Sequence, residues 1–508
     1  MVQILIRYIC STRNISLSSL NFKMSDKKEF SLKWIYITAM LVFLLTAWFS
    51  VGYNHYDEHF QIMEFAGLKL GLTEEASLPW EYKSMMRPAL QPLIVVLVYK
   101  TFAVTGVTNP FIITFFLRLL TAILAFVSIH MVIKVYKPMI TNRKLLYAFL
   151  MLSFFLWFVP YNSVRFSSET VSGRVFLSGL AWFLLRKQPK QLDYMMAGIL
   201  MGISFILRYQ IAFMILGFAA WLIFRKAGFR NILMFVAGIM IITALGVVID
   251  SWFYDKWVLT SWNYFQQNIL LNKAANFGSS PWWYYIEQTF LQAFPPISII
   301  YILSVFIYFI FYPKSVLTWT ILPFLAIHFL IPHKELRFMY PLIGFLPVMM
   351  IEAVNFLVKN KGYELLEHSV TKISVKVLWY LNLGMLVVLI FRPADNQISM
   401  YEKIWDKYKT PAKLCFTNDN PYQRAGLYLN FYKRKCVSFE QVDSVQKIKP
   451  AKDTVTLFYT TKSLLKVNEQ LSPVMVYSYF PSWVNHLNIN HWMERTSKWF
   501  VYELRPIP

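Results

Sequence analysis

Long apolar stretches, interrupted by short polar and basic ones, fill the chain between residues 34 and 392. A helix needs about 20 apolar residues to cross the hydrocarbon core of a bilayer. The pattern therefore predicts an all-α polytopic membrane protein with about eleven transmembrane helices. Several of the predicted spans are short, so the pattern does not define their tilt or their end positions. The predicted spans lie near 34–52, 110–134, 145–160, 171–186, 193–207, 208–224, 231–250, 289–311, 315–332, 339–358 and 375–392.

The stretch 89–106 is ambiguous, because it is only moderately apolar and carries Pro92 and Lys100. It can either cross the membrane or dip into it. Cytoplasmic loops are enriched in Lys and Arg, and the basic clusters downstream all reach the cytoplasm only if 89–106 makes no full crossing. We therefore predict that it does not span. The clusters are Lys134 with Lys137, Arg143 and Lys144; Arg186 with Lys187 and Lys190; Arg225 with Lys226 and Arg230; Lys314; and Lys359 with Lys361, Lys372 and Lys376.

The amino-terminal segment 1–33 is polar and basic. It lacks the long apolar core and the small-residue cleavage site of a signal peptide, and Met24 is an alternative start. Lys27, Lys28 and Lys33 precede the first apolar run, so this segment is predicted to stay in the cytoplasm.

The carboxyl-terminal tail, 393–508, is polar. It has strand-like runs at 455–461, 474–480 and 499–504 and a helix-like run at 422–432. The tail is predicted to be a small α/β domain outside the membrane, on the non-cytoplasmic side.

Composition supports the membrane assignment. Of the 508 residues, 57% are hydrophobic and 15% charged, which excludes a soluble globule with one core. The formal charge of +23 would suggest nucleic-acid binding, but the cations follow the positive-inside pattern and no recognition motif is present. Cys10, Cys415 and Cys436 lack metal-binding spacing, and the last two can pair or stay free.

This topology gathers most of the remaining polar residues on the outer face of the membrane. The predicted outer segments are a first loop 53–109, the segment 161–170, the turn 208–210, a long loop 251–288, the segment 333–338 and the tail. The first loop also contains Phe60, Met63, Phe65 and Leu68 at spacings that suit a helix lying in the interface.

A charged cluster follows Pro332, between two apolar runs. If a helix resumes there, His333 and Arg337 lie one turn apart on one face and Lys334 lies beside them, so that all three converge on one anion. Cations at span ends also snorkel to the interface. Anion binding is favoured here because the cluster lies on the side that the positive-inside rule leaves poor in cations.

The adjacent carboxylates Asp57 and Glu58 lie in the first outer loop. Partial burial can raise the pKa of such a group toward the range of a general base. Equally, Asn54 can cap the next helix, with both carboxylates complementing its dipole.

Other outer residues are weaker candidates. Arg165 and Arg208 can each fork onto a phosphate or a sugar hydroxyl, although a single arginine at a span end is more often structural. Tryptophans of the long loop form either an interfacial belt or a sugar-stacking surface, and the belt is the default. These tryptophans are Trp252, Trp257, Trp262, Trp282 and Trp283.

Several ordered motifs together resemble glycosyltransferase family 22, the membrane mannosyltransferases of N-glycan precursor and GPI-anchor assembly. The motifs are His333–Phe338 followed by Tyr340-Pro341; Asp250–Tyr254, Trp257, Asn272-Lys273 and Asn276–Tyr285; and Asp57-Glu58 with Trp80–Tyr82 and Arg87. The resemblance covers about residues 34–392 and implies a GT-C transmembrane catalytic domain. The tail has no counterpart in it.

The resemblance further implies a dolichyl or other polyprenyl phosphate mannose as donor and a glycan or glycolipid as acceptor. Transfer would take place on the periplasmic face of a bacterial inner membrane or on the lumenal face of the endoplasmic reticulum. Because the phosphate leaves as a stabilised anion, the protein must supply a base and cations, and no cofactor or metal is required. A single displacement would invert the anomeric centre.

Roles for individual residues follow from the same resemblance. Asp57 is the predicted base, with Glu58 as the alternative. The predicted donor-phosphate ligands are His333, Lys334, Arg337, Arg165 and Arg208, and the predicted acceptor or sugar contacts are Glu81, Arg87, Asn276, Trp282 and Trp283.

Two other functions compete with sugar transfer. A transporter or flippase of lipid-linked sugars would have paired charges near the midplane and repeated halves, neither of which the pattern shows. A scaffold that binds lipid-linked glycans without catalysis would keep the cations and tolerate loss of the base.

Overall fold

The computed structural model describes residues 26–362, 364–450, 453–461, 467, 470–480, 482–495 and 498–507. The predicted features of residues 1–25, including the alternative start, lie outside the described residues. The chain divides into two compact units at Leu41 and Val42. Helix α2 (Asp26–Phe49) crosses this boundary, and the site and contacts discussed below belong to the second unit.

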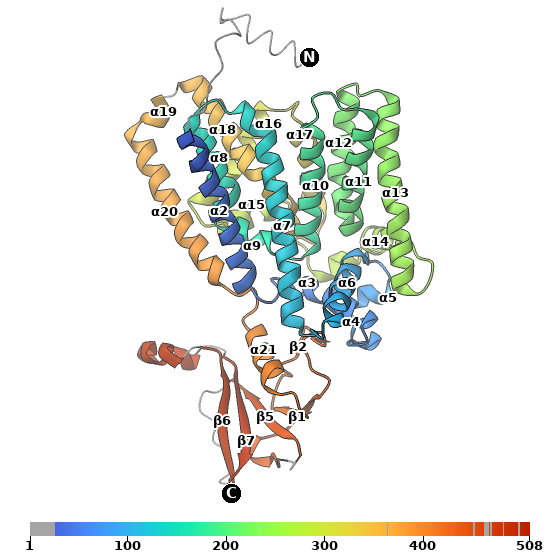
Figure 1. Cartoon of the computed structure of the whole chain (residues 1–508), viewed down its shortest axis with the longest axis vertical. Coiled ribbons are helices and arrows are strands. Elements are labelled where there is room, and N and C mark those ends of the chain that lie inside the picture. Colours follow the sequence, from blue (N-terminus) through green and yellow to red (C-terminus); the bar gives the residue numbers. More distant parts are fainter. Residues whose placement is uncertain are drawn as a thin grey trace, which may run out of the picture. The chain divides into compact units, whose positions relative to one another are not determined.

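Helices make up the region of the predicted spans (Figure 1). The long helices are α2 (Asp26–Phe49), α7 (Pro110–Tyr136), α8 (Arg143–Phe155), α10 (Ser168–Leu184), α11 (Gln191–Leu207), α12 (Ala212–Phe224), α13 (Phe229–Tyr254), α16 (Ile297–Phe311), α17 (Val316–Leu330), α18 (Leu346–Lys361) and α20 (Ser369–Phe391). Shorter elements between them are η3 (Lys137–Met139), α9 (Phe158–Ser163), η4 (Tyr209–Ile211), η7 (Leu336–Phe345) and α19 (Glu364–Glu367).

Each predicted span falls on one of these helices or on a consecutive pair. Among the described residues, five helices are long and apolar enough to cross a membrane, or six if α16 and α17, bent by 119°, form one broken span. The other predicted spans fall on shorter apolar helices, such as α11 and α12. The chain is thus a multi-pass membrane protein, and the count of eleven crossings stays a prediction.

Glycines allow the helices to approach closely. A Cβ on Gly198 of α11 would lie 2.1 Å from the carbonyl oxygen of Phe235 in α13, and one on Gly217 of α12 would lie 1.9 Å from that of Trp319 in α17. Small residues at such crossings let membrane helices pack backbone to backbone. The crossing of α10 with η7 is equally tight, since a Cβ on Gly173 would lie 2.5 Å from Pro341 Cα.

The first outer loop folds into short helices at one end of the bundle (Figure 1). They are α3 (Tyr56–Phe60), α4 (Met63–Lys69), η2 (Glu75–Ser77), α5 (Trp80–Lys83) and α6 (Leu90–Val104). With 15 residues, α6 is about 22 Å long at 1.5 Å per residue, which is less than the thickness of the hydrocarbon core. Its start is fixed at the end of α13, where Ala89 N donates to Asp250 Oδ1 at 2.7 Å.

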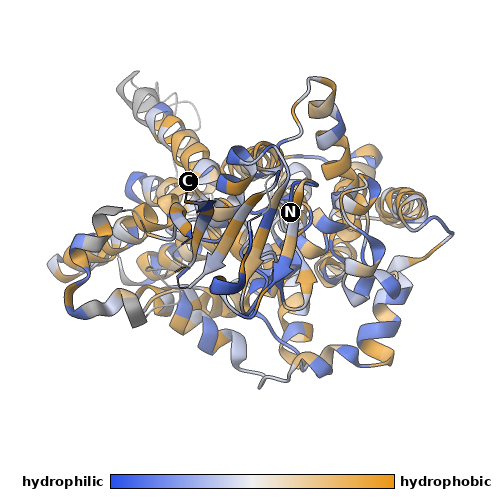
Figure 2. Cartoon of the chain, turned by 90° about the horizontal axis from the view of Figure 1, so that it is seen from below, coloured by the Kyte–Doolittle hydropathy of each residue, from blue (hydrophilic) through white to orange (hydrophobic). Residues whose placement is uncertain are grey.

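The long outer loop also contains short helices. They are α14 (Thr260–Phe265), the π-helical turn η5 (Gln266–Leu270), η6 (Lys273–Phe277) and α15 (Tyr284–Gln292). Orange, hydrophobic residues predominate on the long helices in Figure 2, whereas the strands of the tail carry hydrophobic and hydrophilic bands side by side.

The tail forms helix α21 (Ile398–Lys407) and a five-stranded sheet of order β4-β1-β5-β7-β6. Strands β1, β4 and β5 are parallel, and β7 runs antiparallel to β5 and β6. The strands are β1 (Ala412–Phe416), β4 (Val437–Gln441), β5 (Val455–Thr460), β6 (Leu471–Ser478) and β7 (Phe500–Pro506), and the 3-10 turns are η8 (Val445–Lys447), η9 (Ser482–Leu487) and η10 (Ile489–Arg495).

The three strand-like runs predicted in the tail coincide with β5, β6 and β7, but the helix predicted at 422–432 is wrong. That segment is a hairpin of β2 (Gln423–Arg424) and β3 (Leu427–Tyr428). Ala425 and Gly426 between them adopt positive φ angles of 48° and 79°, which turn the chain back and are incompatible with a helix. Cys415 and Cys436 are free, so the alternative of a disulfide is wrong.

One hydrophobic core extends from the first outer loop through the start of α7 to the tail. It includes Phe60 and Met63 of the loop, Phe111 of α7, and Phe431 and Tyr432 that follow the hairpin. The tail therefore packs against the loop that carries Asp57 and Glu58.

Candidate active site

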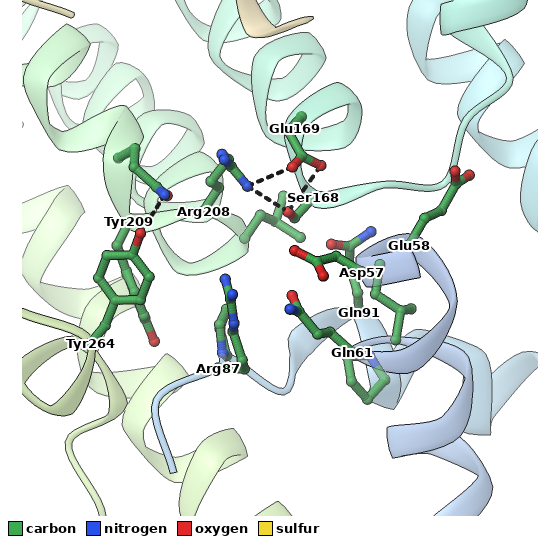
Figure 3. Close-up of a pocket in the computed structure, with 15 residues that line it drawn as sticks. Asp57, Glu58, Gln61, Arg87, Gln91, Ser168, Glu169, Arg208, Tyr209 and Tyr264 are labelled. Atoms are coloured by element: carbon green, nitrogen blue, oxygen red, sulfur yellow. Dashed lines mark hydrogen bonds and ion pairs between the residues drawn. The ribbon is translucent and has the colours of Figure 1, made fainter. Parts of the chain in front are cut away.

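A cavity that is open to solvent lies between the first outer loop, the start of α10 and the turn from α11 to α12 (Figure 3). Most of the residues that line it are polar. The lining residues are Asp57, Glu58, Gln61, Ile62, Arg87, Pro88, Gln91, Pro92, Ser168, Glu169, Leu207, Arg208, Tyr209, Gln210 and Tyr264.

Helix α3 presents both candidate bases. Its cap is His55, whose Nδ1 accepts from Asp57 N at 3.3 Å, so the alternative that Asn54 caps this helix is wrong. Asn54 N instead donates to Glu58 Oε2 at 2.8 Å. In Figure 3 the Asp57 carboxylate points into the cavity between Arg87 and Arg208, whereas the Glu58 carboxylate points away from them.

Arg337 joins three carboxylates from different elements. Its Nη2 donates to Asp57 Oδ2 at 2.7 Å and its Nη1 to Glu169 Oε1 at 2.9 Å. Its Nε and Nη2 also fork onto Glu335, at 2.7 and 2.9 Å. Arg337 is buried, and such bidentate, charge-assisted bonds fix the relative positions of α3, α10 and the start of η7.

The condition that a helix resumes directly after Pro332 is not met, because the next helical segment begins only at Leu336. His333 and Arg337 are instead brought together by Glu335, which lies 3.0 Å from His333 Nε2. Glu335, directly before this helical segment, is extended, with φ −135° and ψ 138°.

Lys334 and His333 hold the long outer loop. Lys334 Nζ donates to the carbonyl oxygens of Ile331 and, at 3.1 Å, of Ser280. His333 Nδ1 lies 3.3 Å from the carbonyl oxygen of Gly278. Neither residue lines the cavity. The three cations predicted to converge on one anion therefore have separate partners, because His333 and Lys334 bind the long loop and Arg337 binds carboxylates.

The two single arginines have different positions. Arg208 lines the cavity, where its Nη1 donates to Glu169 Oε1 at 2.9 Å and to Ser168 Oγ at 3.0 Å. Its Nε and Nη2 are buried without a partner among the described residues. Arg165 does not line this cavity and binds Gly52 O, at 3.0 Å, and Ser50 Oγ, at 2.7 Å.

The predicted acceptor contacts also separate into two groups. Arg87 lines the cavity, with Nη2 3.3 Å from Glu81 Oε1, and Glu81 also accepts from Gln61 Nε2 at 3.0 Å. Asn276, Trp282 and Trp283 are exposed residues of the long loop that do not line the cavity. Their predicted roles are not tested by this arrangement.

Two carboxylates of the site, Glu169 and Glu335, were not identified as candidates from the sequence. Glu169 lies in the first turn of α10, a position where an acid ordinarily complements the helix dipole. Glu335 lies inside the charged motif, in which only the cations His333, Lys334 and Arg337 suit the binding of an anion. A signal was available for both, since each is an acid on the face where the predicted topology gathers unexplained polar residues.

The two candidate bases have opposite pKa shifts. Burial favours the neutral form of Asp57, but the Arg337 and Arg87 guanidiniums outweigh it and lower the pKa of Asp57 below its ordinary value. Burial raises the pKa of Glu58 above its ordinary value, because Arg165, 3.9 Å away, offsets it only partly. At neutral pH Asp57 is the ionised acceptor that faces the cavity.

These shifts give a pH test of which carboxylate is the base. A base acts only when deprotonated, and kcat/KM follows its pKa in the free protein. With Asp57 as base, we expect kcat/KM to stay level as the pH falls through 5 and to decline only below the ordinary aspartate range of about 4. A decline that begins above the ordinary glutamate range would assign the role to Glu58. The measurement is a pH profile of kcat/KM corrected for unfolding at each pH.

A solved structure places this fold in a class. ArnT from Cupriavidus metallidurans, described as bound to undecaprenyl phosphate, matches with a TM-score of 0.53 at 11% identity, over 93% of this chain and 98% of that one. The apo structure of the same protein matches with a TM-score of 0.52. ArnT is a GT-C enzyme, so the fold is that of the GT-C polytopic membrane glycosyltransferases.

The chain belongs to the Alg9-like mannosyltransferase family, whose model matches residues 34–424. The family resemblance noted in the sequence is thereby confirmed, and it extends beyond residue 392 into the first part of the tail, which was expected to have no counterpart. GPI mannosyltransferase 3 of Candida albicans is 27% identical over 268 residues, 52% of each chain. Human GPI alpha-1,2-mannosyltransferase 3 is 26% identical over 281 residues, 53% of this chain and 48% of the human protein. The matches thus span about half the length of these relatives.

Proposed function

We propose that this protein is a membrane mannosyltransferase that moves a mannosyl residue from a polyprenyl phosphate donor to the hydroxyl of a glycan or glycolipid. The observation that carries the proposal is the cavity, in which the ionised Asp57 lies opposite arginines with unpaired N–H groups. Membership of a mannosyltransferase family supports the sugar, and the transporter alternative is not favoured.

The donor phosphate would bind at Arg208 and Arg87. Arg208 Nε and Nη2 and Arg87 Nε are buried and have no partner among the described residues. A buried guanidinium with unused donors is costly unless an anion accepts from it, and a phosphate matches its fork geometry. Arg337 lies near this site, and it could also bind the phosphate if one of its carboxylate partners moved away from it.

Lys334 and His333 would reach the phosphate only by leaving the carbonyl oxygens of Ser280, Ile331 and Gly278. We therefore assign them first to holding the long loop in place and second to the phosphate. Arg165 would serve by holding the turn at residues 50–52, since its Nη1 and Nη2 donate to Gly52 and Ser50.

The transfer would be a single inverting displacement. Asp57 would accept the proton of the acceptor hydroxyl as its oxygen attacks the anomeric carbon. The bond from that carbon to the phosphate oxygen breaks, and its electron pair leaves with the polyprenyl phosphate. Guanidiniums held in place beside the phosphate would stabilise the departing anion most in the transition state.

The relatives named as GPI mannosyltransferases favour a glycolipid acceptor in the endoplasmic reticulum over a bacterial glycan. In the proposed topology the eleven predicted helices cross the membrane, and the first loop, the long loop and the tail lie on its non-cytoplasmic face. Acceptor and donor would then meet where the sugar of a polyprenyl phosphate projects from the bilayer.

Reconstitution tests this proposal. The purified full chain in liposomes should transfer mannose from a polyprenyl phosphate mannose to at least one member of a panel of glycan and glycolipid acceptors, with inversion read by NMR of the product. Movement of the donor between leaflets without any product would instead indicate a flippase. Donor binding with neither product nor movement would indicate a scaffold.

A further inference from the structure

The described part of the tail makes a buried polar contact with the first outer loop. Phe431 N donates to Glu64 Oε1 at 3.0 Å, across 367 positions of sequence. The same carboxylate accepts from Thr73 Oγ1 and lies 2.7 Å from His59 Nε2, and its side chain is fully buried. A buried carboxylate requires hydrogen-bond partners. The backbone of the tail supplies one of those partners for Glu64 of the loop.

Aromatic stacking reinforces this contact. The Tyr432 ring stacks on His59 of α3, with centroids 5.2 Å apart and an interplanar angle of 15°. It also stacks on Phe111 of α7, with centroids 5.1 Å apart and an angle of 26°. Tyr432 is 2% exposed, and its ring is packed between α3 and the start of α7. His59 follows Glu58 directly and lies two residues after Asp57.

A second cavity, also open to solvent, lies on the side of α3 that Tyr432 contacts. Glu58 lines both cavities, and Tyr432 and Arg118 are among the residues that close the second one. Loss of the Tyr432 ring would enlarge this space and remove the ring that stacks on His59, which would keep its contacts with Tyr53, Phe60 and Glu64. The carboxylates of α3 would then be free to shift relative to Arg87 and Arg208.

The tail also holds the chain that enters α3. Ala394 N and Asp395 N donate to the carbonyl oxygen of Val51, at 2.8 and 3.2 Å. Gly52, at φ 87°, approaches so closely that a Cβ there would lie 2.7 Å from Ile398 Cγ1. The stretch from Val51 to Glu64 is therefore fixed by the tail at both ends.

From this geometry we propose that the tail is a positioning element of the active site, and that Tyr432 and Glu64 are positioning residues that set where Asp57 points. The inference rests on the proposed transfer reaction. Neither residue lines the cavity that faces Arg208, so each acts through α3 and not on substrate.

The test compares two tyrosines of the same hairpin region in the full chain. Tyr432→Ala should lower kcat by about 10- to 100-fold, since a base displaced by about 1 Å costs rate on this scale, while the KM for the donor changes little. Tyr428→Ala is the matched control, because Tyr428 is 39% exposed and should leave kcat unchanged. Tyr432→Phe keeps the stacked ring and should restore most of the rate.

Hydrogen exchange supplies a readout that does not depend on activity. Tyr432→Ala should accelerate exchange at residues 56–62 and leave α11 and α13 unchanged, whereas Tyr428→Ala should change neither. Unaltered kcat and exchange in Tyr432→Ala would overturn the inference while wild-type transfer upholds the proposed function. Equal losses of kcat and of donor affinity in Tyr432→Ala and Tyr432→Phe would also overturn it, by pointing to general destabilisation.

Discussion

Asn in place of Asp57 is expected to lower kcat/KM for mannosyl transfer by about 10²- to 10⁴-fold, the range that a general base contributes. Asn has nearly the same shape, but it cannot accept the proton of the acceptor hydroxyl. It also keeps an oxygen that can accept from Arg337 Nη2, so the carboxylate cluster should persist. Donor affinity should therefore survive, which an equilibrium titration with polyprenyl phosphate would show.

The matched variant is Glu58→Gln, one residue further along α3. Glu58 binds Asn54 N and points away from the arginines of the cavity, so we expect a smaller loss of rate than for Asp57→Asn. If Asp57→Asn retains transfer and Glu58→Gln abolishes it, the roles assigned to the two carboxylates are reversed. If both retain full activity, neither is the base.

The second large effect is expected for Arg337→Ala, which should abolish transfer and destabilise the protein. Removal of Arg337 leaves Asp57, Glu169 and Glu335 facing one another without the cation that joins them. Breaking a buried ion pair by deleting one partner costs about 3–5 kcal/mol, and here one deletion affects three carboxylates. Thermal unfolding in detergent and transfer in liposomes measure the two effects separately.

Arg337→Lys distinguishes charge from geometry. Lysine keeps the cation but cannot make the forked contact with Glu335 together with bonds to Asp57 and Glu169. We expect it to recover much of the stability and little of the activity. An Arg337→Ala protein that unfolds at the wild-type temperature would contradict the central role given to this ion-pair cluster.

The sequence predicted those features that depend on neighbouring residues or on the position of a segment relative to the membrane. Apolar runs located the helices, the distribution of Lys and Arg gathered the polar residues on one face, and ordered motifs indicated the family. Three of the strands in the tail were also recognised from their β-branched and aromatic residues. Within the site, Asp57 and Arg337 were identified and the structure brings them within 2.7 Å of each other.

Other features depend on contacts between distant segments, which a single sequence does not contain. Lys334 and Arg337 look equivalent in sequence, but one binds backbone carbonyls of the long loop and the other binds three carboxylates. Glu169 was overlooked because an acid in the first turn of a helix has a local explanation. The hairpin at 422–432 was misassigned because its pattern of apolar residues also suits a short helix, and only the positive φ angles decide.

The bond between Phe431 N and Glu64 also bears on how the protein is made. A five-residue helix such as α3 is too short to be stable on its own, so its geometry depends on partners from elsewhere in the chain. One of those partners, Phe431, follows the predicted spans in the chain and therefore leaves the ribosome after them. The nascent membrane domain would thus stay catalytically silent during translation, and a chain truncated before Leu429 would insert into the membrane without gaining activity.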